Sequence, residues 1–355
     1  MTLVLHVQKV KGISGSEAHL LTLLPALRSR GWDARMIVLH EEEPEAAEFV
    51  ARLTATGVPV DAWRMRLDLD PLVVARLLRL RPTILHTHLV HGDLLALPPG
   101  ALRRVPVRIS TKHGFNEFRS NRVLATADRL AGRLAHRQIA ISAGLARYLE
   151  QIEGFARDSF TIVHYGIAAG ADPPAPPVAP RLVAVGRLIP IKGLDILLRA
   201  FARARTGLPE LTLEIAGSGP LESELRRSAP EGVTFLGRVE DVATVYERSA
   251  IVVVPSRGEG FGMVALEAAE RGRAAIVSDV GGLPEIVVDG ETGVVVPPED
   301  VDALAGALVA LASDPGRVRR LGTAARMRAV QEFSLDAATD GVEAVYRDEL
   351  ARRSP

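Results

Sequence analysis

Short apolar runs alternate with helix-like segments along the whole chain, and this alternation constrains the fold more than any single motif. The runs lie at residues 3–7, 34–39, 84–88 and 107–110 in the first half, and at 181–185, 212–216, 233–236, 251–255 and 275–277 in the second. Continuous apolar strands separated by helices are typical of parallel sheets covered on both faces. The pattern predicts an α/β protein with two doubly wound, Rossmann-like domains facing a central cleft, where ligands bind beyond the carboxyl ends of the strands.

A proline-rich stretch at residues 172–180 marks the expected boundary, because closely spaced prolines favour an extended, stiff connector. The charge changes at the same place. Residues 1–170 carry 22 Lys and Arg against 16 Asp and Glu, a net charge of +6, whereas residues 171–355 carry 21 against 27, a net charge of −6. We therefore expect one domain at residues 1–170 and a second at 171–334, followed by a C-terminal helix at about 335–355.

Composition excludes several classes of protein. Acidic and basic residues balance, 43 against 43, which argues against a nucleic-acid partner. The chain has no cysteine, so disulfides, zinc–thiolate sites, iron–sulfur clusters and thiol nucleophiles are excluded. Residues 1–7 resemble a buried strand more than a signal peptide, and no run approaches the ~20 apolar residues that span a bilayer. We expect a cytoplasmic protein.

The most informative motif is the segment at residues 255–268, in which an apolar strand runs into glycines and then a helix. Glycines at such a turn let a ligand approach the backbone, and the helix N-terminus favours an anion. Glu259 is expected in the loop facing the cleft, with Glu267 about two turns along the helix on a similar face. The plain alternative is an acidic residue favoured by the helix dipole.

Two further loops follow predicted strands. In residues 185–195, Arg187 offers a planar fork and Lys192 a point charge, a combination that suits a diphosphate; the alternative is two solvated surface cations. Residues 11–17 are glycine-rich and open a helix. They fit either a phosphate-binding loop without the P-loop lysine or a tight turn capped by Ser14 or Ser16.

Histidines gather near the ends of predicted strands, at His86, His88, His91 and His113. This density of imidazoles could hold a metal, but Asp93 is the only carboxylate close by in the sequence. We favour histidines that line the cleft, with His113 directed at the substrate. We expect no metal and no resident cofactor.

Three short motifs are interpreted as structural. The Asp-x-Asp pairs at residues 68–70 and 300–302 could bind a divalent cation, but helix capping explains them better. The Gly-Ser-Gly-Pro at residues 217–220 is a poor match to a dinucleotide-binding fingerprint.

Taken in order, these motifs resemble those of retaining glycosyltransferases of family 4, which have the GT-B architecture. The matching pieces are residues 12–17, 86–88, 113–114, 186–193, 215–221, 235–237, 259–267 and 281–285. The resemblance implies transfer of a sugar from a nucleotide diphosphate sugar to an acceptor hydroxyl with retention of configuration, in the synthesis of cell-envelope glycans, glycolipids or other glycoconjugates. It implies a UDP- or GDP-sugar as co-substrate, a glycan or lipid-linked acceptor, and a C-terminal helix that packs back on the acceptor-side N-terminal domain.

The resemblance also implies a role for each matching residue of the C-terminal, donor-binding domain. Arg187 and Lys192 would hold the diphosphate, and Glu267 would accept hydrogen bonds from the ribose. Glu259, with the backbone of Gly260, Phe261 and Gly262, would hold the donor sugar.

On the N-terminal side, Ser14 and Gly15 would approach the donor phosphates, and His113 would face the reacting sugar. Residues 239–241 would border the base. Residues 165–168 read Tyr-Gly-Ile-Ala where the family often has Asn-Gly-Ile/Val-Asp, which leaves the role of this turn in doubt.

A basic region at residues 103–137 holds nine Lys and Arg but only Glu117 and Asp128 as acids. Part of it has an amphipathic helical pattern, with Arg119, Arg122, Arg129, Arg133 and Arg137 among Val123, Leu124, Leu130 and Leu134. Such a helix either lies on an anionic membrane at its inner face or packs its apolar stripe in the core.

Two alternative functions remain at this stage. The first is a GT-B-shaped nucleotide-sugar epimerase or hydrolase. The second is a non-catalytic sugar-binding protein, which the presence of Glu259 with Arg187 and Lys192 disfavours.

Overall fold

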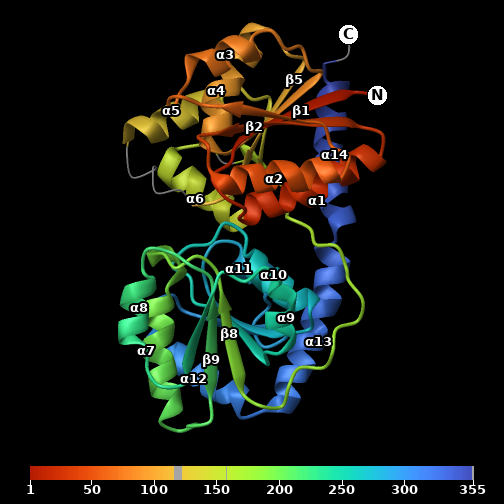
Figure 1. Cartoon of the computed structure of the whole chain (residues 1–355). Helices are drawn as coiled ribbons and strands as arrows, with labels where there is room; N and C mark the ends of the chain where they lie inside the picture. The colour runs from red at the N-terminus through yellow and green to blue at the C-terminus, as the bar shows by residue number, and fades with distance from the viewer. Residues whose placement is uncertain (116–121, 157, 354–355) are drawn as a thin grey trace. The chain divides into compact units, whose positions relative to one another are not determined.

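The computed structural model describes residues 1–115, 122–156 and 158–353, and the chain divides into two compact units (Figure 1). The first unit contains Met1–Gly166 together with Leu335–Pro355, and the second contains Ile167–Ser334. The expected residues Glu117 and Arg119 lie outside the described residues.

The first unit is built on a parallel sheet with the strand order β3-β2-β1-β4-β5-β6-β7. Its strands are β1 (Leu3–Lys9), β2 (Asp33–His40), β3 (Val60–Arg64), β4 (Ile84–His88), β5 (Val107–Lys112), β6 (Arg137–Ala140) and β7 (Phe160–Ile162). Its helices are α1 (Gly15–Ser29), α2 (Pro44–Ala55), α3 (Pro71–Leu77), α4 (Leu89–Leu102), α5 (Arg122–Gly132), α6 (Ala143–Glu153) and α14 (Leu335–Ala351).

The second unit repeats this plan with the strand order β10-β9-β8-β11-β12-β13. Its strands are β8 (Arg181–Val185), β9 (Thr212–Ala216), β10 (Val233–Gly237), β11 (Ile251–Val254), β12 (Ala274–Ser278) and β13 (Gly293–Val296). Its α-helices are α7 (Leu194–Arg205), α8 (Glu222–Ser228), α9 (Val242–Glu247), α10 (Met263–Glu270), α11 (Leu283–Ile286), α12 (Val301–Ala312) and α13 (Pro315–Glu332), with a short 3-10 turn, η2 (Pro190–Lys192), before α7.

The apolar runs form the centres of both sheets, as the pattern predicts. All residues of β4, β11 and β12 are buried, which is why these strands lack polar alternation. The sequence pattern missed β3, β6, β7 and β13. The polar residues of β3 and β6 and the three-residue length of β7 hide them from a search for apolar runs.

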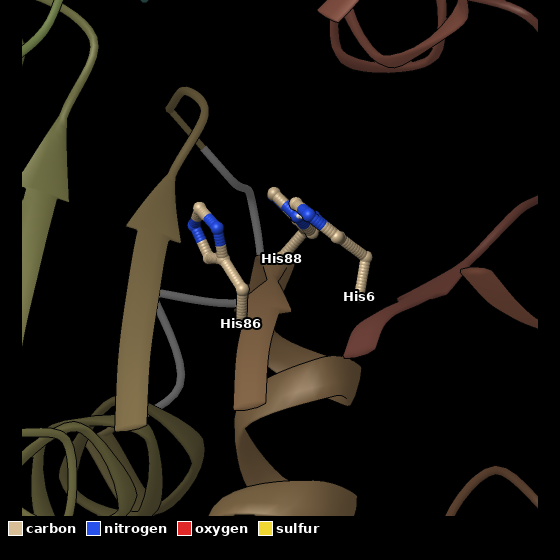
Figure 2. A group of neighbouring side chains, drawn as sticks. All are labelled: His6, His86 and His88. Atoms are coloured by element: carbon tan, nitrogen blue, oxygen red, sulfur yellow. Dashed lines mark hydrogen bonds between the residues drawn. The ribbon is translucent and has the colours of Figure 1, made fainter. Parts of the chain in front are cut away.

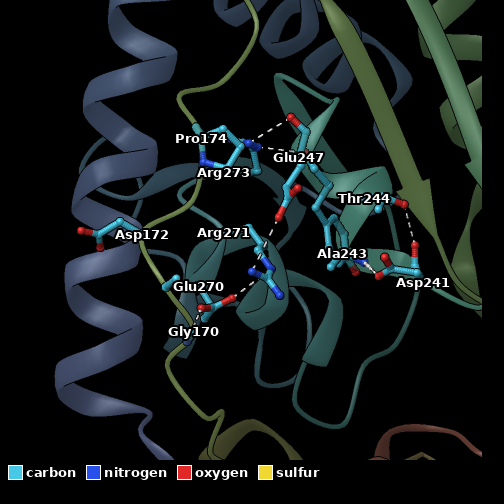
Figure 3. A network of polar contacts seen from close by, with 12 residues as sticks. Gly170, Asp172, Pro174, Asp241, Ala243, Thr244, Glu247, Glu270, Arg271 and Arg273 are labelled. Atoms are coloured by element: carbon cyan, nitrogen blue, oxygen red, sulfur yellow. Dashed lines mark hydrogen bonds and ion pairs between the residues drawn. The ribbon is translucent and has the colours of Figure 1, made fainter.

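The proline-rich segment is extended, but it is attached to the second unit instead of forming a free connector (Figure 3). The Arg273 guanidinium donates a hydrogen bond to the Pro174 carbonyl oxygen (2.9 Å), and Arg326 pairs with Asp172 (3.0 Å). The amide of Gly170 donates to Glu270 (2.9 Å). These contacts fix the path of the chain over the helices of this unit.

The last helix, α14, belongs to the first unit although it is separated from that unit's other elements by the whole second unit. The Trp32 indole donates a hydrogen bond to Glu343 (2.6 Å), and Arg137 pairs with Glu349 (3.1 Å). Val342, Val345 and Tyr346 join the core beneath β1 and β4. The helix therefore completes one face of the first sheet.

Candidate functional site

The strand order of each sheet indicates where a ligand would bind. In doubly wound sheets the crevice opens at the carboxyl ends of the two strands where the order reverses. These strands are β1 and β4 in the first unit, and β8 and β11 in the second. The loops after β8 and β11 are the two loops that carry Arg187, Lys192 and Glu259.

In the second unit, Lys192 and Glu259 are in direct contact. The ammonium group lies 2.6 Å from Oε2 of Glu259, and both side chains are mostly buried, with 22% and 16% exposure. The Ser256 hydroxyl lies 3.4 Å from the same carboxylate oxygen. An ammonium group has three donor hydrogens, so Lys192 retains hydrogen-bonding capacity for a further anion while paired.

Arg187 lies on the same loop but is exposed. Among the residues that the structure describes, its guanidinium forms no hydrogen bond or ion pair. A planar cation left unpaired beside a paired one is suited to a doubly charged anion such as a diphosphate.

Arg257 joins the two loops, a role that the sequence analysis missed. Its guanidinium forms two parallel bonds to Asp195 (2.8 Å each) and a third to the Pro190 carbonyl oxygen (2.7 Å), while its backbone amide donates to the Ile191 carbonyl oxygen (2.8 Å). It also pairs with Glu299 (2.9 Å). The position of this arginine next to Ser256 was visible in the sequence, but its partners were not.

Glycines allow these loops to pack against one another. Gly193 has φ +64°, and a Cβ there would lie 2.0 Å from the Pro255 carbonyl oxygen. Gly217 has φ +141°, and a Cβ there would lie 1.9 Å from the Gly186 carbonyl oxygen. The Gly-Ser-Gly-Pro segment thus provides close backbone contact between the loops after β8 and β9.

The glycine loop before α10 is shaped by packing on both sides. The side chain of Phe261 is 2% exposed and lies edge-on to Phe333, so only its backbone can face a ligand. Gly262 has φ +116°, and a Cβ there would lie 2.6 Å from the Leu283 side chain. Gly260 lies between Glu259 and this tightly packed turn.

Glu267 is held by a buried tyrosine. The Tyr246 hydroxyl donates to Oε2 of Glu267 (2.8 Å), and within the described part of the chain Oε1 has no partner. Burial raises the pKa of the Glu267 carboxyl, and the Tyr246 hydrogen bond opposes this rise. Arg273, which is fully buried, donates to the backbone carbonyls of Tyr246 and Glu247 and so fixes the end of α9 (Figure 3).

The Asp-x-Asp pairs are explained mainly by helix capping. Asp300 accepts from the amides of Asp302 (3.0 Å) and Ala303 (2.9 Å), and Asp70 accepts from that of Leu72 (2.8 Å). Asp68 differs, because it pairs with Lys9 (2.6 Å) and His91 (2.9 Å).

In the segment predicted to border the base, Asp241 caps α9 by accepting from the amide of Ala243 (3.1 Å). This hydrogen bond gives the Asp241 carboxylate a structural role that requires no ligand.

The remaining predicted site residues belong to the first unit. Ser14 is the N-cap of α1, which begins at Gly15, and Glu17 completes a capping box. One Glu17 oxygen accepts from the Ser14 amide (3.0 Å) and from the hydroxyls of Ser14 (2.6 Å) and Ser16 (3.0 Å). The capped-turn interpretation accounts for these contacts, and the Ser14 hydroxyl is already engaged.

His113 follows β5 and uses both of its ring nitrogens. Nε2 is hydrogen-bonded to Nδ1 of His88 (2.8 Å), and Nδ1 to the Tyr165 hydroxyl. Tyr165 stands in the turn that departs from the family pattern, and it also stacks on His19. The structure thus gives this turn a contact with His113.

Three imidazoles, those of His6, His86 and His88, form a buried cluster on neighbouring strands, with their ligand atoms within 4.8 Å of one another (Figure 2). His91 and Asp93 have other partners. His91 pairs with Asp68, whereas Asp93 accepts from Lys112 (2.7 Å) and Ser110 (2.7 Å).

Helix α5 does not bury its apolar stripe. Val123 and Leu130 are 76% and 52% exposed, while Asp128 is fully buried and pairs with Lys112 (3.0 Å). The core-packing alternative for this stripe is therefore wrong for these residues. In the described parts of the chain, no helix combines the length and apolar character needed to cross a bilayer.

Family models match both units. A model described as Glycosyltransferase Family 4 matches residues 13–169, and one described as Glycosyl transferases group 1 matches residues 179–314. The second match spans the loops that carry Arg187, Lys192, Glu259 and Glu267.

Similar proteins include a glycogen synthase of Mycobacterium tuberculosis, which is 32% identical over 289 residues covering 75% of this chain and 69% of the relative. A D-inositol 3-phosphate glycosyltransferase of Rhodococcus erythropolis is 40% identical over 177 residues, covering 46% of this chain and 40% of the relative.

Solved structures share the fold. HepE of Anabaena in complex with UDP-glucose has a TM-score of 0.81 at 19% identity, covering 97% of this chain and 99% of that chain. Sucrose-phosphate synthase of Thermosynechococcus elongatus has a TM-score of 0.80 at 22% identity, covering 99% and 100%. With its two Rossmann-like units, the present chain has the GT-B fold and belongs to glycosyltransferase family 4.

Proposed function

We propose that this chain transfers a sugar from a nucleotide diphosphate sugar to an acceptor hydroxyl, with retention of configuration and without a metal ion. The observation that carries the proposal is the group of charged residues where the second sheet reverses its order: the Lys192–Glu259 pair, on loops that also carry the exposed Arg187. The UDP and UDP-glucose complexes of HepE support a nucleotide-sugar donor.

Glycosyl transfer separates charge, and each charge has a group to stabilise it. The bond between the anomeric carbon and the diphosphate oxygen breaks, so negative charge grows on the diphosphate and positive charge on the sugar ring. Arg187, Lys192 and the backbone amides at the start of α10 stabilise the leaving group. Glu259 holds the sugar and favours its oxocarbenium-like state.

The donor must share or break the Lys192–Glu259 pair when it binds. With the donor in place, Lys192 turns its free hydrogens to the diphosphate while Glu259 accepts from sugar hydroxyls. Glu267 accepts from the ribose through Oε1, since Tyr246 already occupies Oε2. The Gly260–Gly262 backbone lies against the sugar.

Retention follows when the acceptor attacks the face that the leaving group departs from. The acceptor oxygen bonds to the anomeric carbon, and its proton passes to an oxygen of the departing diphosphate. His113, with Ser14 and Gly15, supplies the contacts of the first unit to the donor.

Donor screening tests the proposal most directly. Thermal unfolding is followed with UDP-, GDP- and ADP-sugars, because a ligand at 100 times its Kd stabilises the folded state by about 2.7 kcal/mol. One class of nucleotide sugar should raise the Tm of wild type but not of Glu259→Ala with Lys192→Met. A chain that none of the three stabilises contradicts donor binding.

Product analysis then separates transfer from the other reactions. Donor alone should remain intact over the time in which an added acceptor is glycosylated, and EDTA should not change the rate. Rapid epimerisation or hydrolysis of the donor without acceptor would support the alternative enzyme class.

For the acceptor side, we propose that α5 brings the first unit to an anionic membrane carrying a lipid-linked acceptor. The exposed Val123 and Leu130 lie on a helix whose buried Asp128 anchors it to Lys112. Apolar side chains flanked by arginines suit a headgroup interface. Flotation with phosphatidylglycerol vesicles should recover wild type but not Val123→Asp with Leu130→Asp.

Val178→Asp is the matched control, because Val178 is 71% exposed in the second unit. Equal flotation of the α5 double variant and wild type contradicts membrane contact through α5. No flotation of wild type contradicts membrane contact altogether and leaves a water-soluble acceptor.

A further inference from the structure

A continuous line of side-chain hydrogen bonds leads away from His113 into the core of the first unit. From Nε2 of His113 it passes to His88 (2.8 Å), and from Nε2 of His88 to Nδ1 of His6 (2.9 Å). From His6 a longer bond of 3.4 Å reaches the Tyr346 hydroxyl on α14. Tyr346 is also bonded to Nδ1 of His86 (2.6 Å).

The line ends on the neighbouring strand, where Nε2 of His86 is bonded to the Thr111 hydroxyl of β5 (2.7 Å). Four elements thus contribute: β1 with His6, β4 with His86 and His88, β5 with Thr111, and α14 with Tyr346. His6 and His86 stand opposite each other in the β1–β4 register, and the period of two in a strand puts His88 on the same face. The rings lie 4.4 to 5.2 Å apart, centroid to centroid (Figure 2).

Burial favours the neutral form of all three cluster histidines by lowering the pKa of each. Burial, followed by the neighbouring His19, lowers the pKa of His6 to about 3. Burial and the surrounding histidines also hold the pKa of His86 and His88 well below its usual range. A neutral imidazole has one donor and one acceptor nitrogen, so each ring that donates on one side must accept on the other. Because His6, His88 and His113 are bonded ring to ring, the tautomer of one of these three fixes the tautomers of the other two.

The backbone around His88 is constrained as well. Leu89, the next residue, has φ +59°, a conformation that is rare for residues other than glycine and persists only where the surroundings enforce it. Gly92, one turn into α4, would place a Cβ 2.7 Å from the Val7 carbonyl oxygen. The start of α4 is therefore tightly seated on β1, beside the line of histidines.

We propose that His88 is a positioning residue for His113, and that His6, Tyr346 and His86 form a relay that holds His88 in one tautomer and one orientation. The relay sets which nitrogen of His113 carries the proton and prevents its ring from turning over. Because His88 holds Nε2, a sugar hydroxyl meets the ring at Nδ1, where it takes the place of the Tyr165 hydroxyl. The proposal rests on the role of His113 in the proposed function.

A metal ion is the competing explanation for three buried imidazoles. Two nitrogens on one tetrahedral zinc at ~2.0–2.1 Å each are about 3.3 Å apart, and neither then bonds the other. Here the facing nitrogens of His6 and His88 are 2.9 Å apart, and both nitrogens of His86 are bonded to hydroxyls. No ring nitrogen of the cluster is left without a partner. The relay fits these contacts better than a metal does.

Two amide substitutions at residue 88 distinguish the hydrogen bond at Nδ1 from the hydrogen bond at Nε2. In His88→Asn the amide occupies the position of Nδ1 and keeps a bond toward His113. In His88→Gln it reaches the position of Nε2 and keeps only the bond toward His6. We expect kcat to fall about threefold in H88N, and roughly 10- to 100-fold in H88Q and in His88→Phe, because small misplacements of a reacting group have effects of this size.

The donor KM should change less than about threefold in these variants, because the charged donor contacts lie in the second unit. His136→Phe is the matched control, since His136 also lies in the first unit but its ring bonds only the Arg108 amide among the described residues. Tyr346→Phe removes only the tyrosine hydroxyl and should still fold. We expect it to lower kcat more than the control H136F does but less than H88F does.

A second readout does not depend on activity. Nitrogen-15 spectra of the imidazoles distinguish the Nδ1–H from the Nε2–H tautomer. Wild-type His113 should show one tautomer, and His88→Phe should show an average of both. If His113→Phe retains full kcat, the catalytic role of His113 fails, but the spectra still test the relay.

Three results would overturn the relay. The first is equal kcat in H88N and H88Q, because the side of the ring would then not matter. The second is a single His113 tautomer that persists in His88→Phe. The third is stoichiometric binding of added ZnCl2 by wild type that is lost in His86→Phe, because the cluster would then be a metal site.

Discussion

The two sheets reverse their strand order in the same way but place opposite chemistry there. The strand order reverses between β8 and β11 in the second sheet and between β1 and β4 in the first, and each place is called a reversal here. At the β8–β11 reversal, two loops that contain glycines carry the charged and partly exposed Arg187, Lys192 and Glu259. At the β1–β4 reversal, the rings of His6, His86 and His88 are 0–1% exposed, and Lys9 at the end of β1 is buried and paired with Glu41 and Asp68. All nine histidines and both tryptophans of the chain lie in residues 1–166, whereas the second unit has none of either.

This difference suggests a division of work within one fold. A binding site for a diphosphate needs charges that remain hydrated until the ligand arrives, because burying an unpaired charge is very costly. A positioning network needs the reverse: groups that are uncharged, dry and fully bonded, so that each has a single arrangement. The second unit meets the first requirement and the first unit meets the second.

The largest effect should come from removing a cation at the charged reversal. Lys192→Met should lower kcat/KM by roughly 10²- to 10³-fold, the effect of losing one donor that stabilises developing charge. Arg199→Met is the control, because Arg199 is an exposed cation on the helix that follows. Steady-state transfer at saturating acceptor measures both, and near-wild-type kcat/KM in Lys192→Met would remove the basis for a shared anion site.

The buried histidines of the first unit should make its stability sensitive to acid. Burial lowers the pKa of His6 and of His19 to about 3 from an unfolded value of 6.5. Between those values the unfolded chain binds protons that the folded chain does not. The stability that these groups contribute is therefore complete above pH 6.5 and is lost as the pH falls, by about 1.4 kcal/mol per pH unit for each neutral histidine.

Tryptophan fluorescence reports this effect for the first unit alone, because Trp32 and Trp63 both belong to it. The urea midpoint detected by fluorescence should fall steadily from pH 6.5 to pH 5. The dependence of the unfolding free energy on pH gives the number of protons taken up on unfolding, and His19→Phe should lower this number by about one. A midpoint independent of pH in this range would show that the histidines are not held neutral.

A smaller effect is expected from Arg257, which holds the two loops of the charged reversal together. Arg257→Met removes a two-pronged bond to Asp195 and should raise the donor KM about tenfold while lowering the free energy of unfolding by about 1–2 kcal/mol. Arg257→Lys should not restore the KM, because an ammonium group cannot form the paired geometry. If lysine restores it fully, the charge alone matters and the loops are held by other contacts.

The sequence was sufficient to predict those elements and sites that depend on local pattern. Strands such as β8 and β9 appear with the expected ends because their residues are mostly apolar and bounded by turns. The two loops that contain Lys192 and Glu259 could be identified from glycines between a strand and a helix. These features are properties of a few consecutive residues.

Features that depend on long-range contacts could not be predicted in this way. Tyr346 is 260 residues from His86, yet the two are bonded, and Trp32 bonds Glu343 across 311 residues. His6 was not singled out because one histidine in an apolar strand carries no signal until β1 and β4 are paired. Likewise, Arg257 and Tyr246 became functional candidates only once their partners were visible.

The smallest effect on donor binding is expected at Tyr246. Its hydroxyl is hydrogen-bonded to Glu267 and to none of the charged residues Arg187, Lys192 and Glu259. Tyr246→Phe frees Oε2 of Glu267 and removes a hydrogen bond worth about 1 kcal/mol. Because burial raises the pKa of Glu267 and the tyrosine opposes the rise, its loss should raise that pKa further. The donor KM should therefore increase by a factor of about three at pH 7 and more below it, whereas kcat should stay constant. Thr244→Val on the same helix is the control, and a KM that is independent of pH in Tyr246→Phe would contradict a role for ionised Glu267 in holding the donor.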